Sequence, residues 1–178
     1  MIDDETGLAM TMAIQSKPRN PRVSENNVFQ IVTWTKGLGD PHGWGSRDAF
    51  LSHIRTQDHL MYRLRTCDHF RRPTLAVLLD TSVPTAGYAF AHYDLLRLEL
   101  DAPGDIGPDE VKRAEEMLLV ELLAYEDYIR GHVYSFSIFD RAGTLIETQD
   151  NLYGEDYAEH LARTAFDDHR LGLGADNA

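Results

Sequence analysis

The fold class that the sequence predicts rests on the stretch Gly107–Gly131, GPDEVKRAEEMLLVELLAYEDYIRG. Pro108 followed by two acidic residues is typical of a helix N-terminus, and Gly131 can end the helix at the other side. Between these ends, apolar residues recur at helical spacing at Val111, Ala114, Leu118, Leu122, Tyr125 and Ile129. The sequence therefore predicts a long helix over about residues 108–130.

The apolar surface of this helix is wider than one stripe. Leu119, Val120 and Leu123 extend it well round the side. The helix then either lies centrally against a sheet or presents its second face to another subunit. Burial within the chain is the favoured interpretation, and a homodimer stays possible.

Strands are predicted before and after the long helix in the sequence. Runs rich in β-branched and aromatic residues, or with alternating apolar residues such as LRLELD, are typical of strands. The predicted strands are Val28–Thr35, Thr74–Asp80 and a run within Tyr88–Asp101. Val133–Asp140 and Thr144–Thr148 predict a hairpin, with Gly143 at the turn position that tolerates positive φ.

Two shorter helices complete the expected elements. Apolar residues at helical spacing predict one from Ser46, as N-cap, to about Thr56 and another from Glu155 to about Asp168. Residues 59–70 fit either a helix or a strand. Together these elements predict an α+β fold, with a mainly antiparallel sheet packed against the long central helix and a short C-terminal helix.

The length of 178 residues is that of one domain. Residues 1–26 are polar, contain Pro18 and Pro21 and show no clear periodicity, so we expect a flexible N-terminal arm. Residues 27–170 are expected to form the single α+β domain, and residues 171–178 a frayed tail.

Composition indicates where the protein works. Cys67 is the single cysteine, and the N-terminus has Asp3, Asp4 and Glu5 where a signal peptide would need basic residues. No stretch approaches the apolar length that spans a bilayer. The sequence therefore predicts a cytoplasmic protein without a membrane role.

Charge is distributed unevenly along the chain. Residues 1–76 contain 10 basic and 8 acidic residues, a net charge of +2, whereas residues 77–178 contain 7 and 21, a net charge of −14. Such an acidic half repels nucleic acid and attracts basic surfaces, including those that hold nucleic acid in other proteins. A purely solvating acidic surface is the alternative interpretation.

One loop has the position, but not the details, of a phosphate-binding loop. Residues 37–45, GLGDPHGWG, lie between a predicted strand and a predicted helix. They match neither the P-loop nor G-x-G-x-x-G, and Asp40 would oppose an anion. An enzyme that binds nucleotide or metal through this loop with His42, His53 and Asp58 is therefore the second hypothesis.

Signatures of metal binding and catalysis are weak. Asp58-His59 and Asp68-His69 repeat ten residues apart, and on a continuous helix these histidines would not converge. The sequence lacks G-x-S-x-G and H-E-x-x-H. We therefore expect no catalytic residue, metal site or cofactor.

Residues 134–166 resemble the closing module of small plasmid-, phage- and host-encoded bacterial proteins, most of them uncharacterised. The similarity rests on Tyr153-Gly154-Glu155-Asp156-Tyr157 after a hairpin and on the spaced Ala158, Ala162 and Ala165. This chain has Asn151-Leu152 where those proteins often have a bulky aromatic pair. The resemblance implies a mobile genetic element and no reaction.

These observations favour an acidic, non-catalytic binding protein. We expect an anti-defence inhibitor, of the anti-CRISPR or antirestriction type, that binds no nucleic acid directly but occupies the basic nucleic-acid-binding surface of a protein or complex. The expected partner-binding residues are Asp101, Asp105, Asp109, Glu110, Glu116 and Asp127.

Overall fold

The computed structural model describes residues 1–24, 26–54, 59–69, 72–78 and 82–175. In place of the expected single domain, the chain divides into two compact units. One unit combines Met1–Asn20 with Asp127–Ala178, and the other is Pro21–Glu126. We call them the terminal unit and the central unit.

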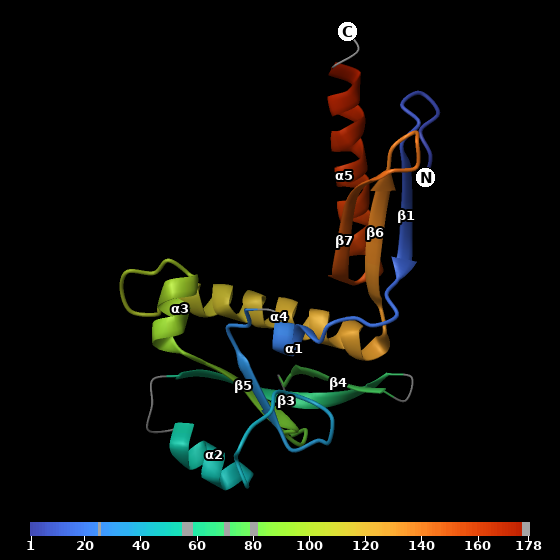
Figure 1. Ribbon diagram of the computed structural model, residues 1–178. Coiled ribbons are helices and arrows are strands. Elements are labelled where there is room, and N and C mark those ends of the chain that lie inside the picture. The colour runs from blue at the N-terminus through green and yellow to red at the C-terminus, as the bar shows by residue number, and fades with distance from the viewer. Residues whose placement is uncertain (25, 55–58, 70–71, 79–81, 176–178) are drawn as a thin grey trace. The chain divides into compact units, whose positions relative to one another are not determined.

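Both units combine helices with antiparallel strands, which confirms the α+β class (Figure 1). The terminal unit has the sheet β1-β6-β7 and the central unit the sheet β2-β5-β3-β4, so the expected single sheet is replaced by two. The strands are β1 Ala9–Ile14, β2 Gln30–Thr33, β3 His59–His69, β4 Arg72–Val77, β5 Gly87–His92, β6 Val133–Phe139 and β7 Leu145–Tyr153. The helices are α1 Pro21–Ser24, α2 Arg47–Ile54, α3 Tyr93–Glu99, α4 Pro108–Arg130 and α5 Glu155–Ala175.

The sheet of the central unit is covered on both faces. Val32, Tyr88 and Phe90 form a buried cluster with Phe50 and Ile54 of α2. Side chains alternate between the two faces of a strand, so the paired residues Tyr62 and Ala89 lie on the other face. There the Tyr62 hydroxyl donates a hydrogen bond to the Val111 carbonyl of α4, at 3.3 Å. Figure 1 shows α2 and α4 on opposite sides of these strands.

The terminal unit buries one face of its sheet against α5. Its core combines Leu8 and Met10 before and in β1, Phe136 and Ile138 of β6, and small or aromatic residues of α5. The α5 residues in this core are Ala158, Ala162 and Phe166, so the spaced alanines allow the helix to lie close to the strands. The opposite face carries residues such as Ser137 and Thr148, which hydrogen-bond to each other at 3.1 Å.

The prediction of a flexible arm over residues 1–26 is wrong. Ala9–Ile14 forms β1, paired with β6 from Ala9 opposite Phe139 to Ile14 opposite Tyr134. Pro21–Ser24 forms α1. The residues of β6 that pair with β1 lie 120 to 130 positions away along the chain, so the local sequence does not show that this polar segment has a sheet to join.

The predicted strand in LRLELD is also wrong, because Tyr93–Glu99 is the helix α3. His92 caps its N-terminus, with ring Nδ1 accepting a hydrogen bond from the Asp94 N–H at 3.1 Å. Leu96 and Leu100, four residues apart, are buried, whereas Leu98 between them is 75% exposed. Burial therefore follows the helical period and not the strand period.

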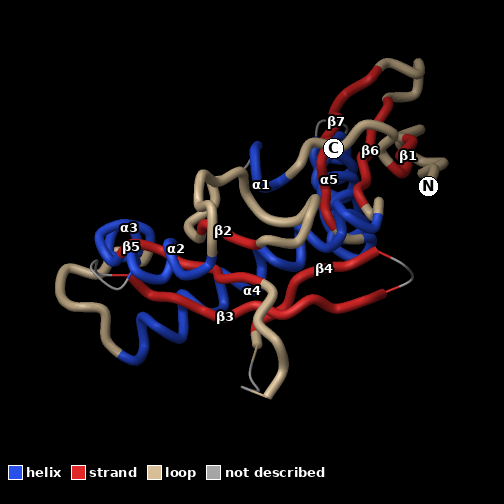
Figure 2. Tube along the Cα trace, turned by 90° about the horizontal axis from the view of Figure 1, so that it is seen from below, coloured by secondary structure: helices blue, strands red, loops and turns tan. Residues whose placement is uncertain are grey.

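Several other boundaries are now defined. The helix predicted over 108–130 is α4, and the boundary between the two units falls inside it, after Glu126. Residues 59–69 form a strand, and Figure 2 shows this strand, β3, alongside β4. The C-terminal helix is longer than predicted and includes residues 171–175 of the expected tail. Parts of five predicted segments lie outside the described residues, namely residues 25, 55–56, 70, 79–80 and 176–178.

Glycine and aspartate form the turns of the terminal unit, as is typical of these residue types. Gly143 has φ +78 in the β6–β7 turn, as expected. The Asp140 carboxylate accepts hydrogen bonds from the N–H groups of Ala142 and Thr144, both at 2.8 Å. Gly154 has φ +90 immediately before α5, where its N–H donates to the His132 carbonyl at 3.0 Å.

Candidate functional site

The region from the end of α3 to the middle of α4 contains the densest group of acids in the central unit. Residues 99–116 hold seven carboxylates and two basic residues, a net charge of −5. The chain turns sharply at Asp101, which has φ +50. This turn, the connection 102–107 and the start of α4 place acids on a loop and a helix that are adjacent in sequence, and we call residues 99–116 the acidic segment.

Three of the predicted partner-binding acids are exposed and unpaired among the described residues: Asp101, Asp109 and Glu116. Asp105 is also fully exposed, and its closest cation, the Arg97 guanidinium, lies at 3.8 Å. Arg97 makes its shorter contact with Asp94, at 2.7 Å. The charge of Asp105 is therefore only weakly neutralised, and all four carboxylates are exposed to solvent.

The other two predicted acids have local roles. The Glu110 carboxylate accepts a hydrogen bond from the Gly107 N–H at 3.0 Å and so stabilises the start of α4. Asp127 belongs to the terminal unit and lies 3.7 Å from His132 Nδ1. The structure thus places four of the six residues on one exposed segment of the central unit and assigns Glu110 and Asp127 to other contacts.

The basic residues of the acidic segment leave its charge largely uncompensated. Arg113 donates to the Leu100 carbonyl at 3.1 Å, which ties α4 to the end of α3. Lys112 is exposed. Neither is in an ion pair within the part of the chain that the structure describes, so these two cations do not neutralise individual carboxylates of the segment.

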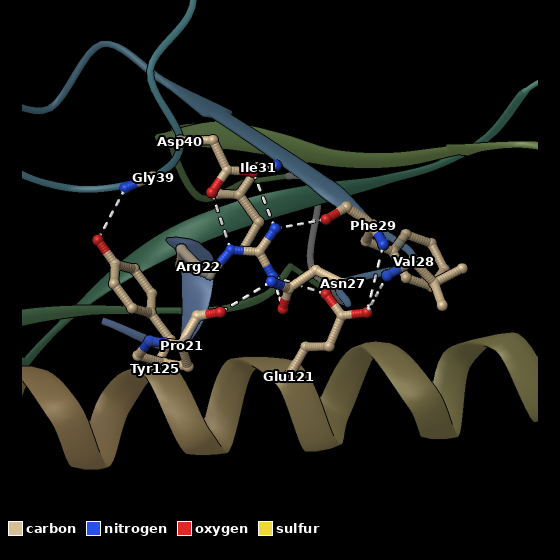
Figure 3. Close-up of polar contacts among 10 residues, drawn as sticks. All are labelled: Pro21, Arg22, Asn27, Val28, Phe29, Ile31, Gly39, Asp40, Glu121 and Tyr125. Atoms are coloured by element: carbon tan, nitrogen blue, oxygen red, sulfur yellow. Dashed lines mark hydrogen bonds and ion pairs between the residues drawn. The ribbon is translucent and has the colours of Figure 1, made fainter. Parts of the chain in front are cut away.

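A buried arginine holds together the region on which α4 lies (Figure 3). The side chain of Arg22 is 2% exposed and forms ion pairs with Asp40 at 2.8 Å and Glu121 at 2.6 Å. It also donates to the Phe29 carbonyl and, at 2.7 Å, to Asn27 Oδ1. Arg22 therefore links α1, the glycine-rich loop and α4 through one guanidinium.

The charges of Arg22, Asp40 and Glu121 are paired with one another. Burial by itself lowers the pKa of Arg22, but Asp40 and then Glu121 raise it above its ordinary value. Burial raises the pKa of Glu121, and the hydrogen bonds from Arg22 and from the Val28 and Phe29 N–H groups offset only part of that rise. The short Arg22 contact and two backbone donors indicate an ionised Glu121 at neutral pH.

The glycine-rich loop 37–45 uses its backbone donors internally. The N–H groups of Leu38 and Asp40 donate to the carbonyls of Thr35 and Ile31, at 3.2 and 2.8 Å. The Gly39 N–H donates to the Tyr125 hydroxyl at 3.0 Å (Figure 3). These three donors are therefore not available to a phosphate, and the loop serves as an attachment point for α4.

A cavity of about 320 Å³ lies beside this loop, lined by Arg22, Gln30, Asp40, His42 and Trp44 among others. His42 donates from Nε2 to the Thr33 carbonyl at 2.9 Å, and its buried Nδ1 has no partner among the described residues. His53 packs against Trp44 instead, with ring centroids 4.8 Å apart. Asp58, the third member of the second hypothesis, lies outside the described residues.

The histidine repeat does not make a metal site. His59 and His69 begin and end β3, and ten residues of strand span about 33 Å. Within the residues that the structure describes, no cluster of histidine, cysteine and acidic residues could hold a metal ion. No described helix is long and apolar enough to cross a bilayer.

Exposed apolar residues mark α4 as a surface element, which the sequence did not lead us to expect. Val120 is 67% exposed and Leu123 60% exposed, and Leu119 is exposed as well. The favoured interpretation of the sequence, burial of these residues within the chain, is therefore wrong. The buried residues of α4 are Ala114, Leu118, Leu122 and Tyr125, which form one narrow stripe.

Comparison of the chain with protein-family models, with curated proteins and with solved structures finds no match. The site must therefore be interpreted from its own chemistry.

Tyr62, which joins β3 to α4, predicts a difference in alkaline stability. Burial raises the pKa of Tyr62 to about 12, and the charges of Glu115 and Tyr93 add to the rise. A tyrosine of an unfolded chain titrates near pH 10, so the stability that Tyr62 contributes is complete below pH 10 and is lost as the pH rises from 10 through 12. Between pH 9 and 11.5 we expect the free energy of unfolding to fall by about 1 kcal/mol more in the wild type than in Tyr62→Phe, after allowance for solvent screening.

Urea unfolding at the two pH values measures this loss. Tyr157→Phe, at an exposed position of α5, is the matched control and should lose as much as the wild type. An identical loss in the wild type and in Tyr62→Phe would contradict the assignment.

Proposed function

We propose that this chain is a non-catalytic binding protein whose acidic segment occupies a basic surface of a partner. The observation that carries the proposal is the set of exposed carboxylates at Asp101, Asp105, Asp109 and Glu116, which have no close ion pair in the described structure. A folded protein that keeps four such charges together stores electrostatic repulsion that a cationic partner relieves. The acidic segment therefore favours guanidinium and ammonium groups as binding partners.

The helical part of the acidic segment suits a surface that normally holds nucleic acid. Asp109 and Glu116 are seven residues apart in α4. They are therefore separated by about 10.5 Å along the helix axis and by only about 20° around it. Three charge steps of one DNA strand span about 10 Å along the duplex axis. Arginine and lysine side chains placed for phosphates can thus meet these carboxylates.

The proposed partner is a nucleic-acid-binding complex of bacterial defence, so that the chain acts as an inhibitor of the anti-CRISPR or antirestriction type. Two sequence features support this narrower proposal: the net charge of −14 over residues 77–178, and the resemblance of residues 134–166 to a module of plasmid and phage proteins. The partner is cytoplasmic under this proposal, and the chain competes with the nucleic acid and does not bind it.

Neutralising the four acids is expected to weaken partner binding strongly without unfolding the chain. Exposed ion pairs contribute roughly 0.5–1 kcal/mol each, so the variant should bind roughly 30- to 1,000-fold more weakly. The measurement is retention of partner proteins from bacterial lysate on the immobilised chain at low salt, followed by elution with rising salt. The substitutions are Asp101→Asn, Asp105→Asn, Asp109→Asn and Glu116→Gln.

A control variant changes the net charge equally in the terminal unit. It removes four exposed acids outside the acidic segment, by Asp4→Asn, Glu5→Gln, Asp150→Asn and Asp168→Asn. Both variants have a net charge of −8 in place of −12. The control should retain the partner and its salt elution. Equal losses in both variants would show a general charge effect, and full retention by the first variant would overturn the proposal.

A further inference from the structure

A groove of about 510 Å³ lies on the central unit at the acidic segment. Its apolar lining comes from three places in the chain: Val28 before β2, Leu100 after α3, and Met117 and Val120 of α4. The volume is in the range of pockets that receive a ligand group. The groove therefore offers apolar contact area beside the exposed carboxylates.

Carboxylates also line this groove, and they differ in how they are paired. Glu121 forms an ion pair with Arg22 and accepts hydrogen bonds from the Val28 and Phe29 N–H groups. Glu99 and Glu116 are exposed and have no ion pair among the described residues. One cation, Arg113, also lines the groove, and it donates to the Leu100 carbonyl. The groove thus has an apolar lining, two carboxylates that lack an ion pair among the described residues, and an arginine that is hydrogen-bonded to the backbone.

We propose that this groove receives an apolar side chain from a partner segment that carries lysine or arginine on both sides of it. The inference rests on the proposed function and names the chemistry of the partner at the same surface. The apolar side chain covers Val120, and the neighbouring cations reach Glu99 and Glu116. Apolar contact supplies the affinity and charge supplies the orientation.

Charge argues against a second copy of the chain as the occupant. Residues 99–116 carry a net charge of −5, and the whole chain carries −12. Pairing of two such surfaces would bring like charges together, which is unfavourable. A cationic segment of another protein has the opposite charge and therefore fits.

Two synthetic peptides test the proposal: acetyl-Lys-Arg-Leu-Arg-Lys-amide and the same peptide with serine in place of leucine. Titration of the ¹⁵N-labelled chain at low salt, followed by NMR, gives a Kd for each. The leucine peptide should bind roughly five- to tenfold more tightly, since it buries apolar surface that serine does not. Amide signals near Val28, Leu100 and Val120 should shift with the leucine peptide.

Matched variants separate groove contact from charge. Val120→Gln should remove the preference for leucine and leave the affinity for the serine peptide unchanged, because no charge is altered. Leu123→Gln, at an equally exposed apolar position that does not line the groove, should keep the preference. Glu116→Gln should weaken binding of both peptides alike.

Three outcomes would overturn the inference. Equal affinity of the wild type for both peptides would show that charge is the only contribution to binding. That result would contradict the inference about the groove but not the proposed function. Absence of salt-dependent binding of either peptide would remove both proposals. A dimer in sedimentation analysis that dissociates in Val120→Gln would make a second copy the occupant of the groove.

Discussion

Replacement of Arg22 by methionine is expected to destabilise the chain by about 3–5 kcal/mol, because it removes a buried cation and leaves two partly buried carboxylates without their partner. The side chain of Arg22 is 2% exposed and lies between Asp40 and Glu121. Methionine fills similar space and cannot donate a hydrogen bond. The variant also loses the contact with the Phe29 carbonyl, so the segment before β2 is no longer linked to α1 through this side chain.

Tryptophan fluorescence during urea unfolding measures this effect. Both tryptophans, Trp34 and Trp44, lie in the central unit, so their signal reports on the part of the chain that contains Arg22. Arg65→Met is the matched control at an exposed position of β3 and should change the free energy of unfolding by less than about 0.5 kcal/mol. An Arg22→Met variant as stable as this control would contradict the role of the network.

Leu8→Ala is expected to cost about 2–5 kcal/mol, since Leu8 is fully buried and its truncation leaves a cavity. Leu8 precedes β1 and packs in one cluster with Phe136, Ile138 and Phe166. If residues 1–26 were a flexible arm, the same substitution would have no effect. The variant therefore tests whether the N-terminus is an integral part of the terminal unit.

Far-UV circular dichroism during thermal unfolding measures the effect of Leu8→Ala, because β1, β6, β7 and α5 all contribute to that signal. Ile14→Ala, at an exposed position at the end of β1, is the control and should shift the midpoint only slightly. Equal, small shifts in both variants would show that residues 8–14 do not stabilise the fold.

The sequence was most informative where local signals agree with the fold. The proline, acids and glycine at the ends of α4 fixed its bounds, and Gly143 identified the β6–β7 turn. Elements that depend on distant partners were missed. In β1, Met10 pairs with Ile138 and Met12 with Phe136, and no local pattern reveals such a partner.

The misassigned helix α3 shows a second limit of pattern reading. Leu96, Leu98 and Leu100 alternate with polar residues as in a strand, yet Leu96 and Leu100 also have the four-residue spacing of a helix. The hydrogen bond from the Asp94 N–H to His92 favours the helix, and a pattern of apolar residues contains no information about this bond. Short apolar runs remain ambiguous for this reason.

The candidate site was predictable in charge but not in detail. Composition located the acids in the second half of the chain, and Asp101, Asp105, Asp109 and Glu116 are indeed exposed. The sequence did not predict that the Glu110 carboxylate would accept a hydrogen bond from the Gly107 N–H, because this contact depends on the geometry at the start of α4. The Arg22 network joins residues up to 99 positions apart and had no sequence signal.

Competition with nucleic acid tests the central claim most directly. The partner recovered from lysate is loaded with a fluorescent nucleic acid, and the chain is titrated in at salt concentrations of about 50 and 200 mM, a range over which such contacts weaken strongly. The account predicts that the chain displaces the nucleic acid, that higher salt raises the concentration needed, and that the variant lacking the four acids needs a concentration roughly 30- to 1,000-fold higher. A complex in which the partner holds the chain and the nucleic acid together would contradict it.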